Sequence, residues 1–83
     1  MKPRKTVSSG DIQVWRDRND QLHREDGPAV IYPDGSEDWY WHGKLHREDG
    51  PAVTRPDGRR ELWFEGKYYD DEFVFRMMVA SKP

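Results

Sequence analysis

The string LHREDGPAV occupies residues 22–30 and returns unchanged at residues 45–53. When both copies are extended through the Pro-Asp-Gly that follows, 12 of 14 positions agree. Self-similarity at a fixed spacing, here 23 residues, is typical of repeat proteins, in which each unit packs on its neighbours. LWFEGK at 62–67 resembles WYWHGK at 39–44, again 23 residues apart. IQVWRD at 12–17 is a further fragment that leads into the first copy. The sequence therefore predicts about two and a half repeats.

Two kinds of turn separate short runs of strand-forming residues. Pro-Asp-Gly at 33–35 and 56–58 suits a type I turn that ends on a glycine with positive φ. His-Gly at 42–43 and Glu-Gly at 65–66 place a glycine where a tight hairpin needs one. Turns at intervals of about 8–12 residues indicate an antiparallel meander. We therefore predict a mainly β domain of antiparallel hairpins over residues 11–69, in a twisted sheet.

The two ends of the chain are predicted to differ from the repeats. Residues 1–10 are basic and small-polar, and we expect them to form a flexible tail. Asp70 and Asp71 are N-cap candidates before EFVFRMMVA, which predicts a short helix over 70–80, followed by a tail at 81–83.

The predicted helix is expected to pack on the sheet and cap the last repeat. At helical spacing, Phe73, Met77 and Ala80 form one stripe, with Val74 and Met78 beside it. The alternative is an amphipathic helix that is offered to a partner, which the pair of adaptable methionines favours.

Composition excludes several classes of function. The chain has 14 basic and 16 acidic residues, which argues against a dedicated binder of duplex nucleic acid or a polybasic membrane binder. The absence of cysteine excludes disulfides, thiolate zinc sites and a cysteine nucleophile, and fits a cytoplasmic protein. No apolar run approaches the roughly 18–20 residues of a membrane span. We therefore predict a cytoplasmic protein without a membrane span.

Catalysis and metal binding are both weakly indicated. Carboxylates are paired at 25–26 and 48–49, but consecutive residues of an extended strand point to opposite faces. His42 and His46 flank a turn and could hold a metal with Glu48 or Asp49. The stronger interpretation is a hydrogen bond from one repeat to the next. We therefore predict no enzyme, no cofactor and no metal site.

The residues that recur with the string are interpreted as the framework of the repeat. The aspartates are expected to accept hydrogen bonds from backbone N–H groups at the Gly-Pro kink, and the arginines to pair with a carboxylate of the adjoining repeat. The predicted structural residues are His23, Arg24, Asp26, Gly27, His46, Arg47, Asp49 and Gly50.

Partner recognition is predicted where the two copies disagree. The first copy has Ile-Tyr at 31–32 and an acidic segment at 36–38, whereas the second has Thr-Arg at 54–55 and a basic segment at 59–61. Aromatic and arginine side chains are common at protein interfaces, and they also stack on single-stranded nucleic acid. The predicted partner-binding residues are Tyr32, Glu37, Asp38, Tyr40, Arg55, Arg59, Arg60 and Trp63.

A protein partner is preferred to single-stranded nucleic acid because the formal net charge is −2. The open edges of a short sheet and the opposite charges of its two copies predict a homodimer. A third alternative is a purely structural or oligomerising module.

The stretch from Trp39-Tyr40 through Gly43-Lys44 to His46 and Gly50 resembles the MORN-type repeat, in a short variant met in small phage and bacterial proteins. The resemblance covers residues 12–69 and departs from the common form in having Glu-Asp before the glycine and Pro after it. It implies an elongated β-hairpin repeat that serves as an interaction module. It further suggests a phage-encoded modulator or inhibitor of a host protein.

Overall fold

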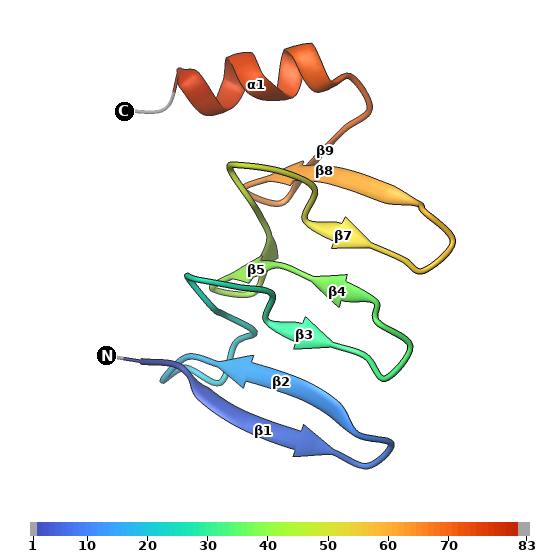
Figure 1. Cartoon of the computed structure of the whole chain (residues 1–83). Coiled ribbons are helices and arrows are strands. Elements are labelled where there is room, and N and C mark those ends of the chain that lie inside the picture. The colour runs from blue at the N-terminus through green and yellow to red at the C-terminus, as the bar shows by residue number, and fades with distance from the viewer. Residues whose placement is uncertain (1, 82–83) are drawn as a thin grey trace.

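The computed structural model describes residues 2–81 and is mainly antiparallel β with one short helix at its C-terminal end, as predicted (Figure 1). Among these residues, seven strands form one meander in the order β1-β2-β3-β4-β7-β8-β9, while β5 and β6 form a separate hairpin. The elements are β1 (Arg4–Ser8), β2 (Ile12–Arg16), β3 (Val30–Ile31), β4 (Glu37–Asp38), β5 (Tyr40–Trp41), β6 (Lys44–Leu45), β7 (Val53–Thr54), β8 (Arg60–Phe64), β9 (Lys67–Tyr69) and α1 (Glu72–Ala80).

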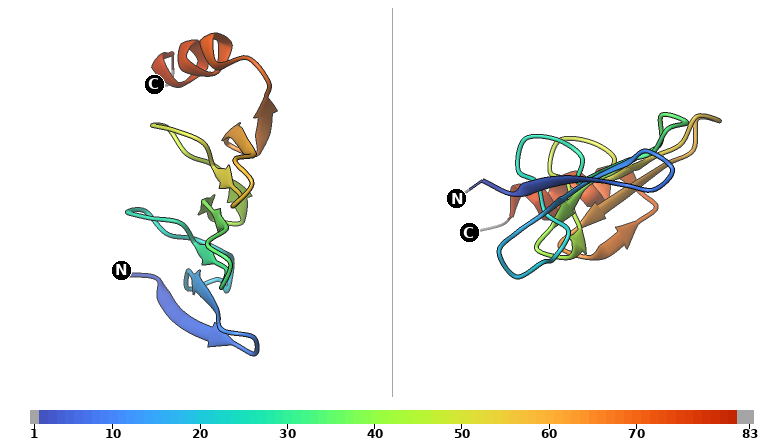
Figure 2. Two further views of the ribbon diagram at one scale, coloured as in Figure 1. Left: turned by 45° about the vertical axis from the view of Figure 1, so that its right-hand side comes forward. Right: turned by 90° about the horizontal axis from the view of Figure 1, so that it is seen from below.

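Successive hairpins stack along one direction, from β1 and β2 at one end to α1 at the other (Figure 1). The turns at 33–35 and 56–58 lie along one edge of this stack, and the loops at 24–28 and 47–51 project from the opposite edge (Figures 1 and 2). The principal extents of the molecule are 38 × 33 × 16 Å, so it is flat.

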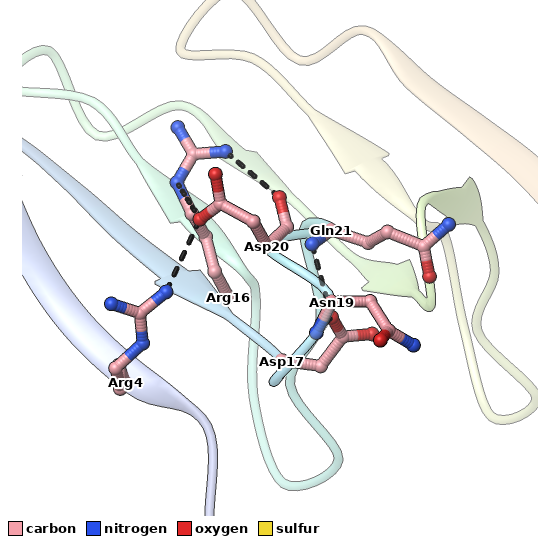
Figure 3. Close-up of polar contacts among 6 residues, drawn as sticks. All are labelled: Arg4, Arg16, Asp17, Asn19, Asp20 and Gln21. Carbon is pink, nitrogen blue, oxygen red and sulfur yellow. Dashed lines mark hydrogen bonds and ion pairs between the residues drawn. The ribbon is translucent and has the colours of Figure 1, made fainter.

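Residues 4–8 correct one expectation, because they form β1 and not a flexible tail. This strand pairs antiparallel with β2 along its whole length, and Arg4 makes an ion pair of 3.2 Å with Asp20 (Figure 3). All five residues of β1 are exposed, so no alternation of apolar and polar residues marks the strand in the sequence. Of the tail predicted at 81–83, Ser81 caps α1 and residues 82–83 lie outside the described residues.

The two Pro-Asp-Gly turns have the predicted geometry. Gly35 and Gly58 have φ of +93° and +92°, and their N–H groups donate to the carbonyl oxygens of Tyr32 and Arg55. Only glycine adopts such a φ without steric cost. Turn chemistry therefore determines where the hairpins β3–β4 and β7–β8 reverse direction.

Buried side chains run across the sheet in one row. Val14, Val30, Asp38 and Val53 are successive cross-strand neighbours, and each is at most 8% exposed. Three of the four are valines, which suit a half-buried pleated surface. Asp38 is a carboxylate in an otherwise apolar row, so it needs polar partners.

The helix α1 caps the last hairpin as predicted, but with different side chains. Phe75 is 3% exposed and packs with Phe64 and Tyr69, whereas the stripe that begins at Phe73 faces solvent. The predicted N-cap is present, since Asp71 Oδ1 accepts a hydrogen bond of 2.8 Å from the N–H of Phe73. The contacts of Phe75 with Phe64 and Tyr69 fix the rotation of the helix. Periodicity could not supply that rotation, because both faces of the helix carry apolar residues.

Candidate functional site

Each LHREDGPAV string folds into a closed loop around its arginine. The Cζ atom of Arg24 lies 3.9 Å from the ring centroid of Trp15, and that of Arg47 lies at the same distance from Trp39. Such cation–π contacts contribute about 0.5–2 kcal/mol each. Each guanidinium also donates to the carboxylate two residues later and to the carbonyl oxygen four residues later. The repeated string therefore builds the same loop twice.

The loops correct the predicted pairing of their charges. The expectation that Arg24 and Arg47 pair with a carboxylate of the adjoining repeat is wrong. They pair inside their own loops with Asp26 and Asp49, at N–O distances of 3.2 and 2.8 Å. The two aspartates accept hydrogen bonds from these guanidinium groups, where the sequence predicts backbone donors. The partner is local because the loop turns each arginine back over its own chain.

Gly27 and Gly50 lie where the arginine side chain crosses the loop. A Cβ atom on Gly27 would lie 2.8 Å from Cζ of Arg24, and one on Gly50 would lie 3.3 Å from Cζ of Arg47. The atom met in each case is at the end of a flexible arginine side chain, so the guanidinium and not the backbone would have to move. Glycine at this position therefore allows the guanidinium to reach its tryptophan.

The histidines of the two strings connect each loop to the next hairpin. We call His23 with the turn at 42–43 the first joint, and His46 with the turn at 65–66 the second joint. His23 Nδ1 accepts a hydrogen bond of 3.0 Å from the N–H of His42, and His46 Nδ1 accepts one of 2.8 Å from the N–H of Glu65. These are the repeat-to-repeat hydrogen bonds that the sequence predicts.

Four of the predicted partner-binding residues lie together, but largely in contact with one another. Tyr32 donates to Asp38 Oδ2 at 3.1 Å, and Arg55 donates to Asp38 Oδ1 at 2.8 Å. Burial raises the pKa values of Tyr32 and Tyr40, and the hydrogen bond to Asp38 raises the pKa of Arg55. This cluster supplies the polar partners of the buried carboxylate, so its first role is structural.

Two of the other four predicted residues lie on the opposite face of the sheet from this cluster. Glu37 and Arg60 are both cross-strand neighbours of Thr54, and side-chain alternation places them on the face opposite Asp38. Arg59 pairs with the carboxylate of the preceding turn at 2.9 Å, and Trp63 Nε1 donates to a neighbouring glutamate at 2.9 Å. The structure therefore divides the predicted interface between two faces of the sheet.

Sequence reasoning missed a cluster of Asp17, His23 and His42 at the first joint. Asp17 Oδ2 lies 2.7 Å from His42 Nδ1, and the rings of His23 and His42 stack with centroids 4.0 Å apart. Asp17 Oδ1 accepts hydrogen bonds from the N–H groups of Asn19 and Gln21 (Figure 3). The hydrogen bond with His42 lowers the pKa of Asp17, and burial lowers the pKa of His23. His42 is therefore a neighbour of Asp17, not of the carboxylates that follow the second histidine.

The repeating frame shows how the first joint acquires this cluster. Asp17 is hydrogen-bonded to Gln21 across its turn, as Trp41 is paired with Lys44 across the next one. Asp17 thus stands where the next unit has a tryptophan. The turn after Asp17 is one residue longer, which shifts the alignment and hides the correspondence. The correspondence between Asp17 and Trp41 is visible when residues are aligned by their partners across each turn. It is not visible when they are aligned at a constant spacing of 23 residues.

The solvent-facing side of α1 carries four large apolar side chains. We define its outer face as Phe73, Val74, Met77 and Met78, whose exposed fractions are 71%, 42%, 56% and 41%. Adjacent exposed apolar residues of this size commonly mark an interaction site. This surface corresponds to the alternative prediction for the helix, in which its apolar residues are offered to a partner.

Comparison with known proteins gives no relative for this chain. No family model matches it, and neither a curated protein nor a solved structure does. The resemblance to MORN-type repeats therefore stays a prediction. Within residues 2–81, no helix is long and apolar enough to cross a bilayer.

Proposed function

We propose that this protein is a protein–protein interaction module that inserts the outer face of α1 into an apolar groove of a partner protein. The observation that carries the proposal is the exposure of four large apolar side chains on a helix that the buried side chain of Phe75 anchors to the sheet. Leaving such side chains in water forgoes roughly 1.5–3 kcal/mol for each one that a partner could fully bury.

The anchoring of α1 favours binding through this face. Phe75 fixes the helix against the last hairpin, so the outer face is held in one orientation before a partner arrives. Preorganisation of this kind reduces the entropy lost on binding. Residues spaced by one helical turn are the usual anchors of a helix in a groove, and flexible methionines adapt to the shape of that groove.

A groove in a different protein suits this face better than a second copy of the chain. Four side chains of α1 offer roughly 400 Å² per copy, so two copies would bury about 800 Å², below the 1,200 Å² of a typical stable interface. A concave groove can enclose the same side chains on several sides. The predicted homodimer and the predicted phage-encoded modulator of a host protein remain predictions.

Single-stranded nucleic acid is less favoured because its expected platform is occupied. Stacking on bases requires aromatic faces with cationic groups beside them. Here Arg55 and Tyr32 are both bonded to Asp38, and the ring of Trp63 lies 5.5 Å from that of Tyr68. No comparable internal contact covers the outer face of α1 among the described residues.

Site-specific photocrosslinking tests the proposal in a lysate of the source cells. A photoreactive phenylalanine analogue replaces Phe73 in one chain and Val7 in another. Val7 is 59% exposed on β1 at the opposite end of the stack, so it is a matched apolar control. We expect one discrete protein adduct from position 73 and none from position 7.

The adduct should disappear when Met77→Ser and Met78→Ser are introduced beside the crosslinker at position 73. Circular dichroism confirms that this variant keeps its helix. Equal adducts from positions 7 and 73, or an adduct that survives the two serines, would show that the outer face is not the binding surface. An adduct with the mass of two copies would replace the proposed partner with a homodimer, and light scattering would verify that mass.

A further inference from the structure

We propose that Asp17, His23 and His42 bind a divalent transition metal ion of the zinc class at the first joint. One ligand atom from each of the three side chains lies within 4.8 Å of the other two. Two imidazole nitrogens and one carboxylate oxygen form a donor set that zinc uses in three-ligand sites, with a fourth position left for water or an anion. This site lies between the end of β2 and the turn of the β5–β6 hairpin, outside α1, and does not depend on the function proposed for the helix.

The three ligand atoms lie within 4.8 Å of one another, so side chains must move by up to about 1.5 Å to reach the spacing of a tetrahedral zinc ion. Zinc bonds of about 2.0–2.2 Å place neighbouring ligand atoms roughly 3.3 Å apart around a tetrahedral ion. Asp17 Oδ2 and His42 Nδ1 are now 2.7 Å apart, so they need to separate by well under about 1 Å. The His42 side chain is 52% exposed and can rotate, whereas Asp17 and His23 are buried and supply a fixed base.

The carboxylate of Asp17 is already oriented for this role. Its Oδ1 atom accepts hydrogen bonds of 2.9 and 3.0 Å from the N–H groups of Asn19 and Gln21, which leaves Oδ2 directed to His42 (Figure 3). Hydrogen bonds of this kind position metal-binding carboxylates and raise affinity. Lys2 and Arg18 line the same cavity of about 340 Å³. Because both are cationic, we expect the fourth ligand to be an anion such as chloride or hydroxide.

Coordination by His23 has one unavoidable structural consequence. A neutral imidazole has one nitrogen lone pair and one N–H, and the lone pair on His23 Nδ1 now accepts from the N–H of His42. If the metal takes Nδ1, that lone pair is no longer available to the amide. If the metal takes Nε2, the ring proton moves to Nδ1, which then cannot accept. Metal binding therefore releases the His42 amide in either case.

The second joint provides an internal control for this prediction. There the N–H of Glu65 donates to His46 Nδ1, and a tryptophan stands in the place of Asp17. A metal ion bound at the first joint should change the amide signal of His42 and leave the amide signal of Glu65 unchanged. Non-specific binding of zinc to histidines would affect both joints.

Titration of the whole chain with zinc chloride, followed by ¹H–¹⁵N correlation spectra and calorimetry, tests the proposal. We expect saturable binding of one ion, a shift and faster solvent exchange of the His42 amide, and reversal by a chelator. Asp17→Asn keeps an oxygen for the two turn hydrogen bonds, and His42→Asn suits the φ of +46° at that position. Each variant should weaken binding by about tenfold or more.

His46→Gln is the matched control, because it removes the equivalent imidazole from the second joint and should leave zinc affinity unchanged. Circular dichroism confirms that each variant is folded. The proposal is overturned if no saturable binding occurs up to millimolar zinc, or if Asp17→Asn and His42→Asn bind as tightly as the parent chain. Equal shifts of the His42 and Glu65 amides would also overturn it.

Discussion

The two joints contain the same histidine in the same nine-residue string, yet their surroundings differ. At the first joint, His23 stacks on His42 beside the buried carboxylate of Asp17. At the second joint, His46 lies near the rings of Trp41 and Phe64, with centroid distances of 6.1 and 5.0 Å. The string supplies the hydrogen bond to the next hairpin in both cases. The positions around it decide whether a second imidazole and a buried carboxylate lie beside that histidine.

The repeated residues build the frame of the molecule, whereas residues outside the string set the local chemistry of each joint. Arg24 and Arg47 make the same kinds of contact in their loops, and the distance from Cζ to the tryptophan ring centroid is 3.9 Å in both. Residues outside the string carry the differences, as Asp17 and His42 show at the first joint. A search for function is therefore better directed at the neighbours of a repeat than at the repeated motif.

The largest expected effect compares two aromatic rings: that of Trp41, whose centroid lies 4.7 Å from that of His23, and that of Phe64, which lies 5.0 Å from that of His46. Phe64 is 7% exposed in the core cluster, whereas its counterpart Trp41 is 40% exposed. Phe64→Ala should lower the free energy of unfolding by about 3 kcal/mol through lost burial and a residual cavity, and Trp41→Ala by about 1 kcal/mol. Urea denaturation at neutral pH measures both. If Phe64→Ala fails to fold, Phe64→Leu supplies a milder loss. Equal losses at the two positions would contradict the difference in burial.

An intermediate effect is expected from the glycines of the two otherwise identical loops. Gly27→Ala places a methyl group 2.8 Å from Cζ of Arg24 and should cost about 1–2 kcal/mol by displacing the guanidinium from its tryptophan. Gly50→Ala meets Arg47 at 3.3 Å, and the lower entropy of its unfolded chain should bring the net change to within about 0.5 kcal/mol of zero. Chemical denaturation of the two variants decides the matter. The same loss in both would show that the loops pack alike.

The smallest effect concerns acid stability at the two Pro-Asp-Gly turns. The hydrogen bond from the backbone N–H of Ser36 lowers the pKa of Asp34 below its ordinary value, and the bond from the N–H of Arg59 does the same for Asp57. A carboxylate with a lowered pKa in the folded state stabilises the protein above the unfolded pKa. This contribution is lost as the pH falls through the folded pKa.

Asp34→Asn and Asp57→Asn should each reduce the fall in melting temperature as the pH drops from about 5 to about 2. The side chain of Arg59 also pairs with Asp57 at 2.9 Å, so Arg59→Ser makes the two turns alike. Thermal melts followed by circular dichroism across this pH range provide the measurement. If the melting temperature of both asparagine variants falls with pH as it does in the parent chain, the turn carboxylates do not contribute to acid stability.

Local chemistry made much of this architecture predictable. The Pro-Asp-Gly turns, the cap at Asp71 and the repeat-to-repeat bonds of His23 and His46 follow from short-range rules. β1 was missed because it is exposed on its whole length and carries no periodic signal. The pairing inside each loop was missed because a sequence does not show how tightly a loop curls. Tyr32 and Arg55 looked free for a partner because nothing local reveals that Asp38 is buried between two valines.

The repeated unit, the places where the chain reverses and the helix at its end follow from turn residues, caps and spacing, which act over a few residues. The burial of one side of α1 and the contact of Asp17 with His42, 25 residues away, arise from tertiary packing. Such contacts depend on the length of turns and on the rotation of packed elements. Both are set by the whole stack, so neither can be inferred from any single segment.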